Sequence, residues 1–262
     1  SIYLRVFDPD TGGELDEQKG EWNTRTTFSV FGGAGACSNE GARRIVRDGN
    51  YKSGTMLASR SFGNDARYDS KWYTFGPFNP GEGELLPEYG GYVFKLVIEG
   101  ISGDDGNLYR LFLSTDREQN RPVEGAFAFY FKYKFRLHDA INEVSHIYPY
   151  MDERVIAIKQ SNFDWDNDGV IRVISPSKNG EVMAISGENH WATSTHQITA
   201  DDINSSLDIQ LIKNKKANIK SNNVVIYLEN QYGELLPFYS IPIGGIPKYK
   251  YNIGIKPKAP VK

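Results

Sequence analysis

The sequence of 262 residues contains a single cysteine, Cys37, so no disulfide bond can form within the chain. One cysteine and four histidines also exclude a zinc centre built on clustered thiolates, which needs several such ligands at close spacing. No apolar run approaches the ~18 residues of a membrane-spanning helix, and the net charge of −3 gives no sign of a nucleic-acid-binding surface. These absences leave a globular protein, whose 39% hydrophobic residues are enough for a packed core.

Catalytic signatures are equally scarce. The sequence has no Gly-x-Ser-x-Gly elbow, no Walker loop and no dinucleotide fingerprint after a strand. The stretch "FGGAGA" (residues 31–36) resembles part of a glycine-rich loop, but no phosphate-binding lysine or helix follows it. We therefore expect no enzymatic activity. A carboxylate pair for glycoside hydrolysis has no fixed spacing in sequence, so a glycan-active hydrolase with an unrecognised pair stays an alternative.

Helical periodicity is nearly absent, whereas strand periodicity is strong. In "GAFAFYFKYKFRL" (residues 125–137) apolar and more polar side chains alternate, which predicts a half-buried strand. Further strands are predicted at residues 3–7, 26–31, 71–75, 92–98, 108–113, 155–158, 170–174, 182–185, 207–212 and 224–228. Turn-forming stretches rich in glycine, proline, asparagine and aspartate separate them. Many short strands between such turns are typical of antiparallel sandwiches or barrels, so we predict an all-β protein.

An internal similarity bears on the number of domains. "LRVFDPDTGGEL" (residues 4–15) aligns without gaps with "IRVISPSKNGEV" (residues 171–182). The similarity favours two tandem antiparallel β-sandwich domains of jelly-roll or Ig-like type, with a chance likeness of two hairpins as the alternative. The predicted boundaries are a first domain at 1–138, a linker at 139–149, a second domain at 150–250 and an extended tail at 251–262. The tail sequence "KPKAPVK" is typical of a linker, so we expect a longer protein.

The first acidic loop, "DPDTGGELDE", directly follows a predicted strand. Where it has Asp8 and Asp10, the second copy of the similarity has Ser175 and Ser177. Serine and aspartate both favour turns, so a turn alone does not require the two aspartates. Calcium takes about six to eight carboxylate and carbonyl oxygens, and loops at one end of a sandwich bring remote residues together. We therefore predict a calcium site, with solvated turns as the alternative, formed by Asp8, Asp10, Asp16, Asp105 and Asn107.

A second acidic stretch, "NFDWDNDG", carries Asp164, Asp166 and Asp168 at alternate positions. This is the start of a D-x-D-x-D-G calcium loop, but position twelve is serine instead of the bidentate glutamate, so an EF-hand is not expected. The stretch predicts either a second calcium site or a solvated turn. Trp165 within it, together with Trp191, also suggests a carbohydrate-binding module that stacks sugar rings on exposed indoles.

Three stretches in the first 135 residues or so resemble one known family: "IYLRVFDPDTGGELDE", "WYTFGPFNPGEGE" and "GYVFKLVIEGISGDDGNLYRLFLS". They are similar to the bacterial pre-peptidase C-terminal domains, small β-sandwiches appended to secreted enzymes and surface proteins. In that family a Y-x-F-x-L-x-V-x-G strand precedes a turn and a Y-x-L-x-x-S strand. The matching positions are Tyr92, Phe94, Leu96, Ile98, Gly100, Tyr109, Leu111 and Ser114.

The resemblance implies an extracellular or periplasmic location, calcium bound by acidic loops and a role in attachment to a substrate or matrix. The first predicted domain is longer than the usual module of this family. We therefore expect a non-catalytic, calcium-stabilised binding or adhesion module of a bacterial protein. Its expected partner is a cell-surface or matrix polymer, either a glycan or a protein.

Overall fold

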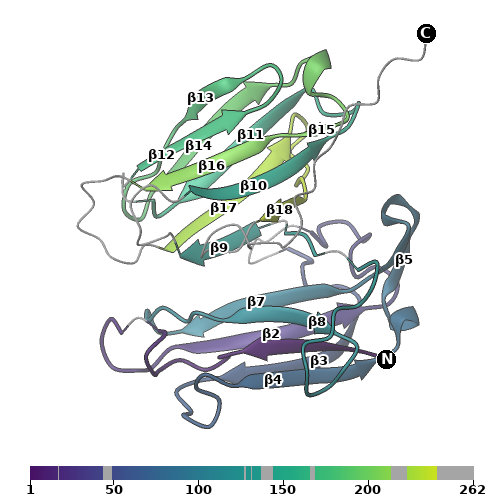
Figure 1. Ribbon diagram of the computed structural model, residues 1–262, viewed down its shortest axis with the longest axis vertical. Helices are drawn as coiled ribbons and strands as arrows, with labels where there is room; N and C mark the ends of the chain where they lie inside the picture. Colours follow the sequence, from purple (N-terminus) through teal and green to yellow (C-terminus); the bar gives the residue numbers. More distant parts are fainter. Residues whose placement is uncertain are drawn as a thin grey trace.

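The computed structural model describes residues 1–16, 18–43, 49–126, 128–130, 132–136, 144–165, 169–213 and 223–240. The prediction of an all-β protein of antiparallel sandwiches is confirmed, because the described residues form antiparallel sheets joined by loops. Their only helical elements are short 3-10 helices. Figure 1 shows two groups of sheets, one from each half of the chain. No helix in the described part of the chain is long and apolar enough to cross a membrane.

The first sandwich, formed by strands between residues 2 and 114, contains two three-stranded sheets. One sheet has the order β4 (Trp72–Phe78), β1 (Ile2–Phe7), β8 (Arg110–Ser114). The other has the order β3 (Thr55–Phe62), β2 (Arg25–Gly32), β7 (Lys95–Ser102). Alternate residues of each strand point inward, so the two sheets enclose one hydrophobic cluster. Its buried members are Ile2, Val6, Phe28, Val30, Phe62, Phe75 and Phe78.

A smaller hydrophobic cluster lies beside this sandwich and includes Phe31, Cys37 and Leu86. It packs near a short hairpin with two 3-10 turns: η1 (Pro80–Glu82), β5 (Glu84–Leu86), η2 (Pro87–Tyr89) and β6 (Gly91–Val93). Cys37 is a buried free thiol, in keeping with a packing role.

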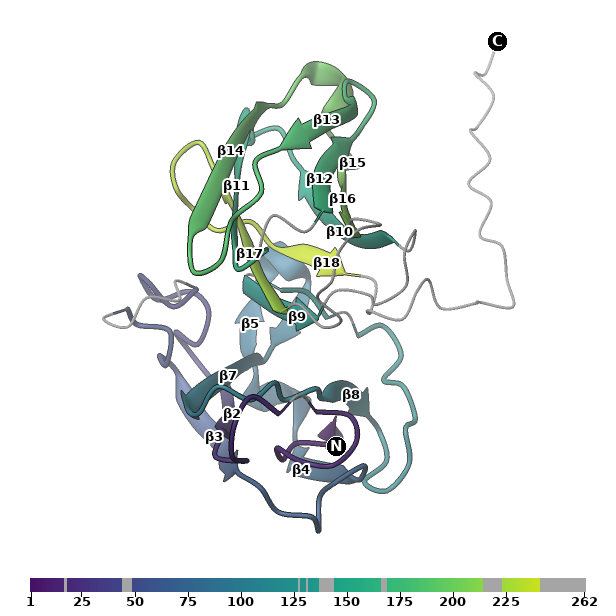
Figure 2. The ribbon, with the colours of Figure 1, turned by 90° about the vertical axis from the view of Figure 1, so that its left-hand side faces the viewer.

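The second sandwich also has two sheets, which Figure 2 shows facing each other. One has the order β13 (Asn179–Met183), β12 (Gly169–Ile174), β16 (Asp208–Lys213), β10 (Val144–Met151), β15 (Ser205–Ser206), and β18 (Phe238–Ser240) also pairs with β10. The other has the order β14 (Trp191–Gln197), β11 (Ala157–Phe163), β17 (Asn223–Asn230), β9 (Lys132–Arg136). A turn η3 (Ala200–Asp202) precedes β15. The buried cluster between the sheets includes Trp165, Ile171 and Phe238.

The strand pairing differs from the predicted domain boundaries at two places. β9 lies inside the predicted first domain, 1–138, yet it pairs with β17 in the second sandwich. β10 starts at Val144, so residues 144–149 of the predicted linker are strand. The sequence does not predict this strand, because the proline at position 149 and the polar side chains before it weaken the strand pattern. The other predicted boundaries stay predictions, and the tail at 251–262 lies outside the described residues.

The internal similarity covers one strand and the turn after it. β12 continues through its turn directly into its hairpin partner β13. β1 instead pairs with β4 and β8, and the chain after its turn runs to β2 in the opposite sheet. The shared sequence therefore forms a strand followed by a turn in two different sheet positions. The turns themselves differ: Ser175 and Lys178 bond to each other's backbone, whereas the matching Asp8 and Thr11 donate to the β3–β4 loop.

Candidate functional site

The turn after β1 is held by two buried aspartates. Asp8 adopts a left-handed conformation, with φ of 55°. Its Oδ1 accepts a hydrogen bond of 2.7 Å from the Ser70 amide, and its own amide donates to the carbonyl of Lys71. The Asp10 Oδ2 accepts a 3.3 Å bond from the Asp65 amide. Both aspartate side chains are only 1% exposed, so the turn is joined to the β3–β4 loop by carboxylates removed from water.

Three oxygen atoms in this region have no hydrogen-bond partner although they are buried. They are Asp8 Oδ2, Asp10 Oδ1 and Asn107 Oδ1. The Asn107 amide nitrogen donates to the carbonyl of Pro9 at 3.1 Å, which places its side chain beside the turn. A buried acceptor left without a donor costs about 1–3 kcal/mol. Carboxylate and amide oxygens of this kind are the ligands that hard cations prefer.

The buried negative charge of the turn is compensated only in part. Burial raises the pKa of Asp8 above its usual range and raises that of Asp10 to about 6. The negative charge of Asp69 raises both values further, and Arg110 lowers that of Asp8. Asp69 packs directly over Gly13, whose φ of +70° and lack of a Cβ leave room for the carboxylate. Three acidic side chains therefore approach one another around the turn.

Asp16 and Asp105, which the sequence places in the same site, have a different role. Asp16 accepts hydrogen bonds from the amides of Gly12 at 2.9 Å and Leu108 at 2.6 Å. Asp105 accepts bonds from the amides of Lys19, Asn23 and Thr24 and from the Thr24 hydroxyl, and these lower its pKa. Both carboxylates therefore hold loop segments together by accepting hydrogen bonds from backbone amides.

The predicted set of five residues thus divides into two groups. Asp8, Asp10 and Asn107 have unpartnered oxygens, whereas Asp16 and Asp105 are saturated with amide donors. No group of three or more histidine, cysteine, aspartate or glutamate side chains among the described residues is arranged to hold a metal ion. A cation at this turn would therefore need Asn107 and backbone carbonyls besides the two aspartates.

The second predicted site is described only in part. Asp164 has a φ of 63°, and its Oδ1 accepts a 3.2 Å hydrogen bond from the Asn189 amide. Asp166 and Asp168 lie outside the described residues. Trp165 is not a surface platform, because its side chain is fully buried in the core of the second sandwich. The indole follows an acidic residue in sequence, but its large apolar area favours burial between the sheets.

Trp191 is 49% exposed and belongs to an aromatic group on the sheet that contains β14. Its ring lies 5.1 Å from that of Phe163 on β11 and 5.4 Å from that of Tyr227 on β17, measured between centroids. The three rings therefore cross three adjacent strands. On the same face, two residues beyond Tyr227 on β17, Glu229 forms a 3.0 Å ion pair with Lys159 of β11.

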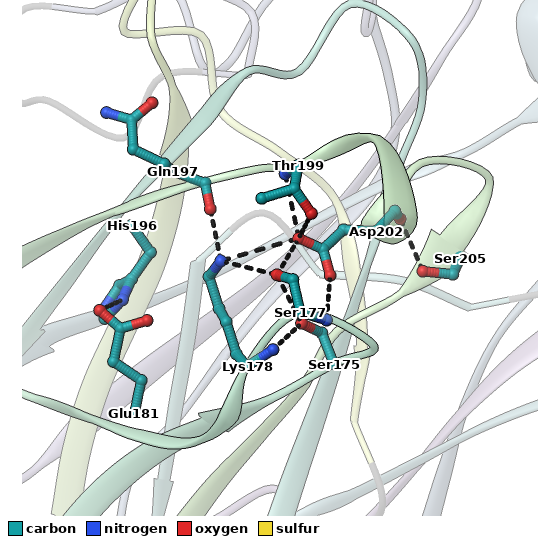
Figure 3. Close-up of polar contacts among 9 residues, drawn as sticks. All are labelled: Ser175, Ser177, Lys178, Glu181, His196, Gln197, Thr199, Asp202 and Ser205. Atoms are coloured by element: carbon teal, nitrogen blue, oxygen red, sulfur yellow. Dashed lines mark hydrogen bonds and ion pairs between the residues drawn. The ribbon is translucent and has the colours of Figure 1, made fainter.

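The turn of the second sandwich that matches the Asp8 turn contains a lysine, Lys178, whose ammonium group lies close to a buried carboxylate (Figure 3). The Ser177 amide and hydroxyl donate to the carboxylate of Asp202, at 3.2 and 2.5 Å. The Lys178 Nζ lies 3.7 Å from Asp202 and donates to the Gln197 carbonyl. Asp202 is fully buried; burial opposes its ionisation, but hydrogen bonds from the turn serines and Thr199 keep its pKa well below the usual range.

Several residues of these sites carry no signal in the sequence. Asp69 and Asp202 reach the two turns from loops that are remote in the chain. Glu84 fills the glycine-rich loop, where its carboxylate accepts hydrogen bonds from the amides of Gly35, Cys37 and Ser38. The loop is thus an anion-binding nest occupied by the protein itself, which explains its likeness to a phosphate-binding loop.

We predict that Lys178→Met destabilises the second sandwich by about 1–3 kcal/mol, because the buried Asp202 would keep its hydrogen bonds from Ser177 and Thr199 but lose the nearby ammonium group. Urea unfolding followed by tryptophan fluorescence measures the change, and Trp165, one of the four tryptophans, reports on that core. The double variant Lys178→Met/Asp202→Asn is the matched control and should recover much of the loss. Equal losses in the single and double variants would contradict a charge-pairing role.

We predict that the calcium-free protein gains stability when the pH falls from 7 to 5. The folded-state pKa of Asp10, about 6, lies above the ordinary value of 3.8. Between those values the folded state binds more protons than the unfolded state, so the free energy of unfolding falls as the pH rises. Chemical denaturation in EDTA at several pH values tests this. Asp10→Asn should remove the gain, and an identical pH profile in that variant would argue against it.

Comparisons with known proteins identify no relative. No family model matches the sequence, and no curated protein matches it. Among solved structures, a chain of the T13 IBDV viral particle is matched at 9% identity with a TM-score of 0.18. The match covers 93% of this chain and 59% of that one. The resemblance to pre-peptidase C-terminal domains therefore remains an expectation from the sequence.

Proposed function

We propose that the chain is a non-catalytic binding module of a bacterial protein, located in the periplasm or outside the cell, and that calcium stabilises its first sandwich. The observation that carries the proposal is the set of buried, unpartnered oxygens of Asp8, Asp10 and Asn107. These oxygens lie at the loop end of the sandwich, where a bound ion would fix the turn after β1 against the β3–β4 loop.

The contrast between the two matching turns supports a cation. In the second sandwich the buried carboxylate of Asp202 lies beside the ammonium group of Lys178. In the first sandwich the position aligned with Lys178 is Thr11, which carries no charge, while the Asp8 and Asp10 carboxylates are as deeply buried. An external cation would supply the charge that the first turn lacks.

Calcium suits the turn better than magnesium. The available oxygens come from two carboxylates, an amide and backbone carbonyls on separate loops, which is an irregular set. Calcium accepts such flexible geometry, whereas magnesium requires near-ideal octahedral coordination at shorter distances. Calcium sites of extracellular modules commonly bind in the range of about 10⁻⁴–10⁻³ M, which fits a location outside the cytoplasm.

The described residues favour binding over catalysis. His146 contacts Asp208 at 2.7 Å and stacks on Tyr148. His196 is buried, and its Nδ1 lies 3.0 Å from Glu181 in a geometry that is not a hydrogen bond. Burial raises the pKa of the Cys37 thiol, which disfavours a nucleophilic thiolate. No observation favours the glycan-active hydrolase alternative, so the proposed partner is a surface or matrix polymer that is bound and not cleaved.

We predict that calcium raises the melting temperature of the first sandwich and that EDTA reverses the rise. Binding to the folded state alone adds RT ln(1 + [L]/Kd), which is about 2.7 kcal/mol at 100 times Kd. Calorimetry of the whole chain with EDTA and then with excess calcium measures it. The double variant Asp8→Asn/Asp10→Asn should abolish the calcium response. Asp164→Asn is the control, and a response lost only in that variant would move the ion to the second sandwich.

A second candidate function is carbohydrate binding on the face that carries Trp191. The observation that favours it is the contact of the Trp191, Phe163 and Tyr227 rings across three strands, with the indole half exposed. Thr193 and Thr195 are exposed on the same strand at alternate positions, so hydroxyl groups flank the rings. An indole beside hydroxyls can stack on the apolar face of a sugar and bond to its edge.

We predict that Trp191→Ala weakens binding to neutral oligosaccharides by at least about tenfold, because the stacking surface is lost. An oligosaccharide array followed by titration calorimetry identifies the sugar and measures the affinity. Tyr232→Ala is the control. Tyr232 is 76% exposed but follows the end of β17 that lies opposite to the end paired, through β11, with Trp191. An array without any bound sugar, or equal losses in the two variants, would count against this function.

A further inference from the structure

A shallow hollow of about 390 Å³ lies on the outer side of the sheet β4-β1-β8, the face turned away from the hydrophobic cluster. Leu4 and Val6 of β1 point into that cluster, so Arg5 between them points outward. The hollow is lined by Arg5, Trp72, Tyr73, Thr74, Arg117 and Glu118. It is distinct from the Asp8 turn and from the face that carries Trp191.

Arg5 is unusual for an arginine on an outer face because only 5% of it is exposed. Its guanidinium carbon lies 4.9 Å from the centroid of the Trp72 ring. Its Nη1 donates to the side-chain oxygen of Asn120 at 2.5 Å, whereas its Nε has no hydrogen-bond partner. No carboxylate in the described part of the chain forms an ion pair with Arg5. A largely buried cation without a carboxylate partner is thus held at the wall of the hollow.

The nearby carboxylate of Asp116 does not compensate this charge directly. It accepts hydrogen bonds from the amides of Glu118 and Gln119 and lies 3.6 Å from Arg121. Arg5 contributes to lowering the pKa of Asp116, but only after those closer groups. Arg117, the second arginine of the lining, is exposed and also has no ion pair with any described carboxylate. Two arginines therefore face one carboxylate, that of Glu118, in the lining.

Packing holds the indole of Trp72 in place. The centroid of its ring lies 5.3 Å from that of Phe7. The guanidinium carbon of Arg110 lies over the Phe7 ring, 4.2 Å from its centroid. The hydroxyl of Thr74 donates to the Arg117 carbonyl at 3.0 Å, which ties the loop after β8 to β4. The hollow therefore has a preset aromatic wall and a positively charged rim, which lowers the entropic cost of binding.

We propose that this hollow binds a uronic acid unit of an acidic polysaccharide. The fork of an arginine guanidinium matches a carboxylate in two parallel hydrogen bonds, and the indole can stack on the C–H face of the pyranose ring. A carboxylate would supply the negative charge that Arg5 and Arg117 lack. A neutral sugar would leave that charge unpaired, and a small inorganic anion would make no use of the aromatic wall.

The test is titration calorimetry of the whole chain with trigalacturonate and with its fully methyl-esterified form, which keeps the sugar rings but replaces each carboxylate by an uncharged ester. The acid should bind, and the ester should bind at least about tenfold more weakly. Arg117→Gln should cause a similar loss without disturbing the core. Arg121→Gln is the control because Arg121 pairs with Asp116 outside the hollow lining, and it should keep the wild-type affinity.

Trp191→Ala separates this site from the face proposed for neutral sugars, and it should leave trigalacturonate binding unchanged. Equal affinities for acid and ester would overturn the proposal, as would a failure of the acid to bind. Loss of binding in Trp191→Ala together with retention in Arg117→Gln would place the ligand on the other sandwich and would also overturn it. None of these results depends on whether calcium binds at the Asp8 turn.

Discussion

The removal of aspartate charges from water at the loop end of the first sandwich is the constraint on which its loops depend. Asp8 and Asp10 join the turn after β1 to the β3–β4 loop, and Asp105 gathers the amides of the chain that leads to β2. These bonds connect segments that are remote in sequence, and they extend the β1–β4 and β2–β7 pairings into the loops beyond the strand ends. Carboxylates thus do here what disulfides do in cysteine-rich secreted domains, since the chain has one cysteine.

The two matching turns show that one sequence pattern allows opposite charge arrangements. In the first sandwich the turn supplies the carboxylate, and the neighbouring loop supplies the amide of Ser70 or Asp65. In the second sandwich the turn supplies the amide of Ser177, and the neighbouring loop supplies the carboxylate of Asp202. Lys178 then neutralises Asp202 from within the turn. The exchange of aspartate for serine reverses the polarity of the contact, and the backbone differs as well, because Asp8 has a positive φ and the matching Ser175 does not.

The sequence predicts the all-β fold because alternation of apolar residues is a local property. Most predicted strands, such as residues 3–7 within β1 and 170–174 within β12, lie in observed strands. β3 and β14 were not predicted, since their exposed faces are rich in polar residues that break the alternation. The pairing of β9 with β17 and the approach of Asp69 to Asp8 depend on contacts between distant segments. Such contacts have no local signature in a single sequence.

The proposed ion site and the proposed ligand surfaces lie in different parts of the molecule. The buried acidic turn lies at the end of the first sandwich, where a proposed ion would act on loop geometry and not on a ligand. The aromatic rings of the two proposed ligand surfaces lie on sheet faces: Trp72 beside Arg5 on one sandwich, and Trp191 beside Phe163 on the other. Trp72 lies on the edge strand β4 and Trp191 on the edge strand β14, so each ring is positioned by pairing with one neighbouring strand, β1 or β11. A ligand bound there would respond to ring and charge substitutions far more than to calcium.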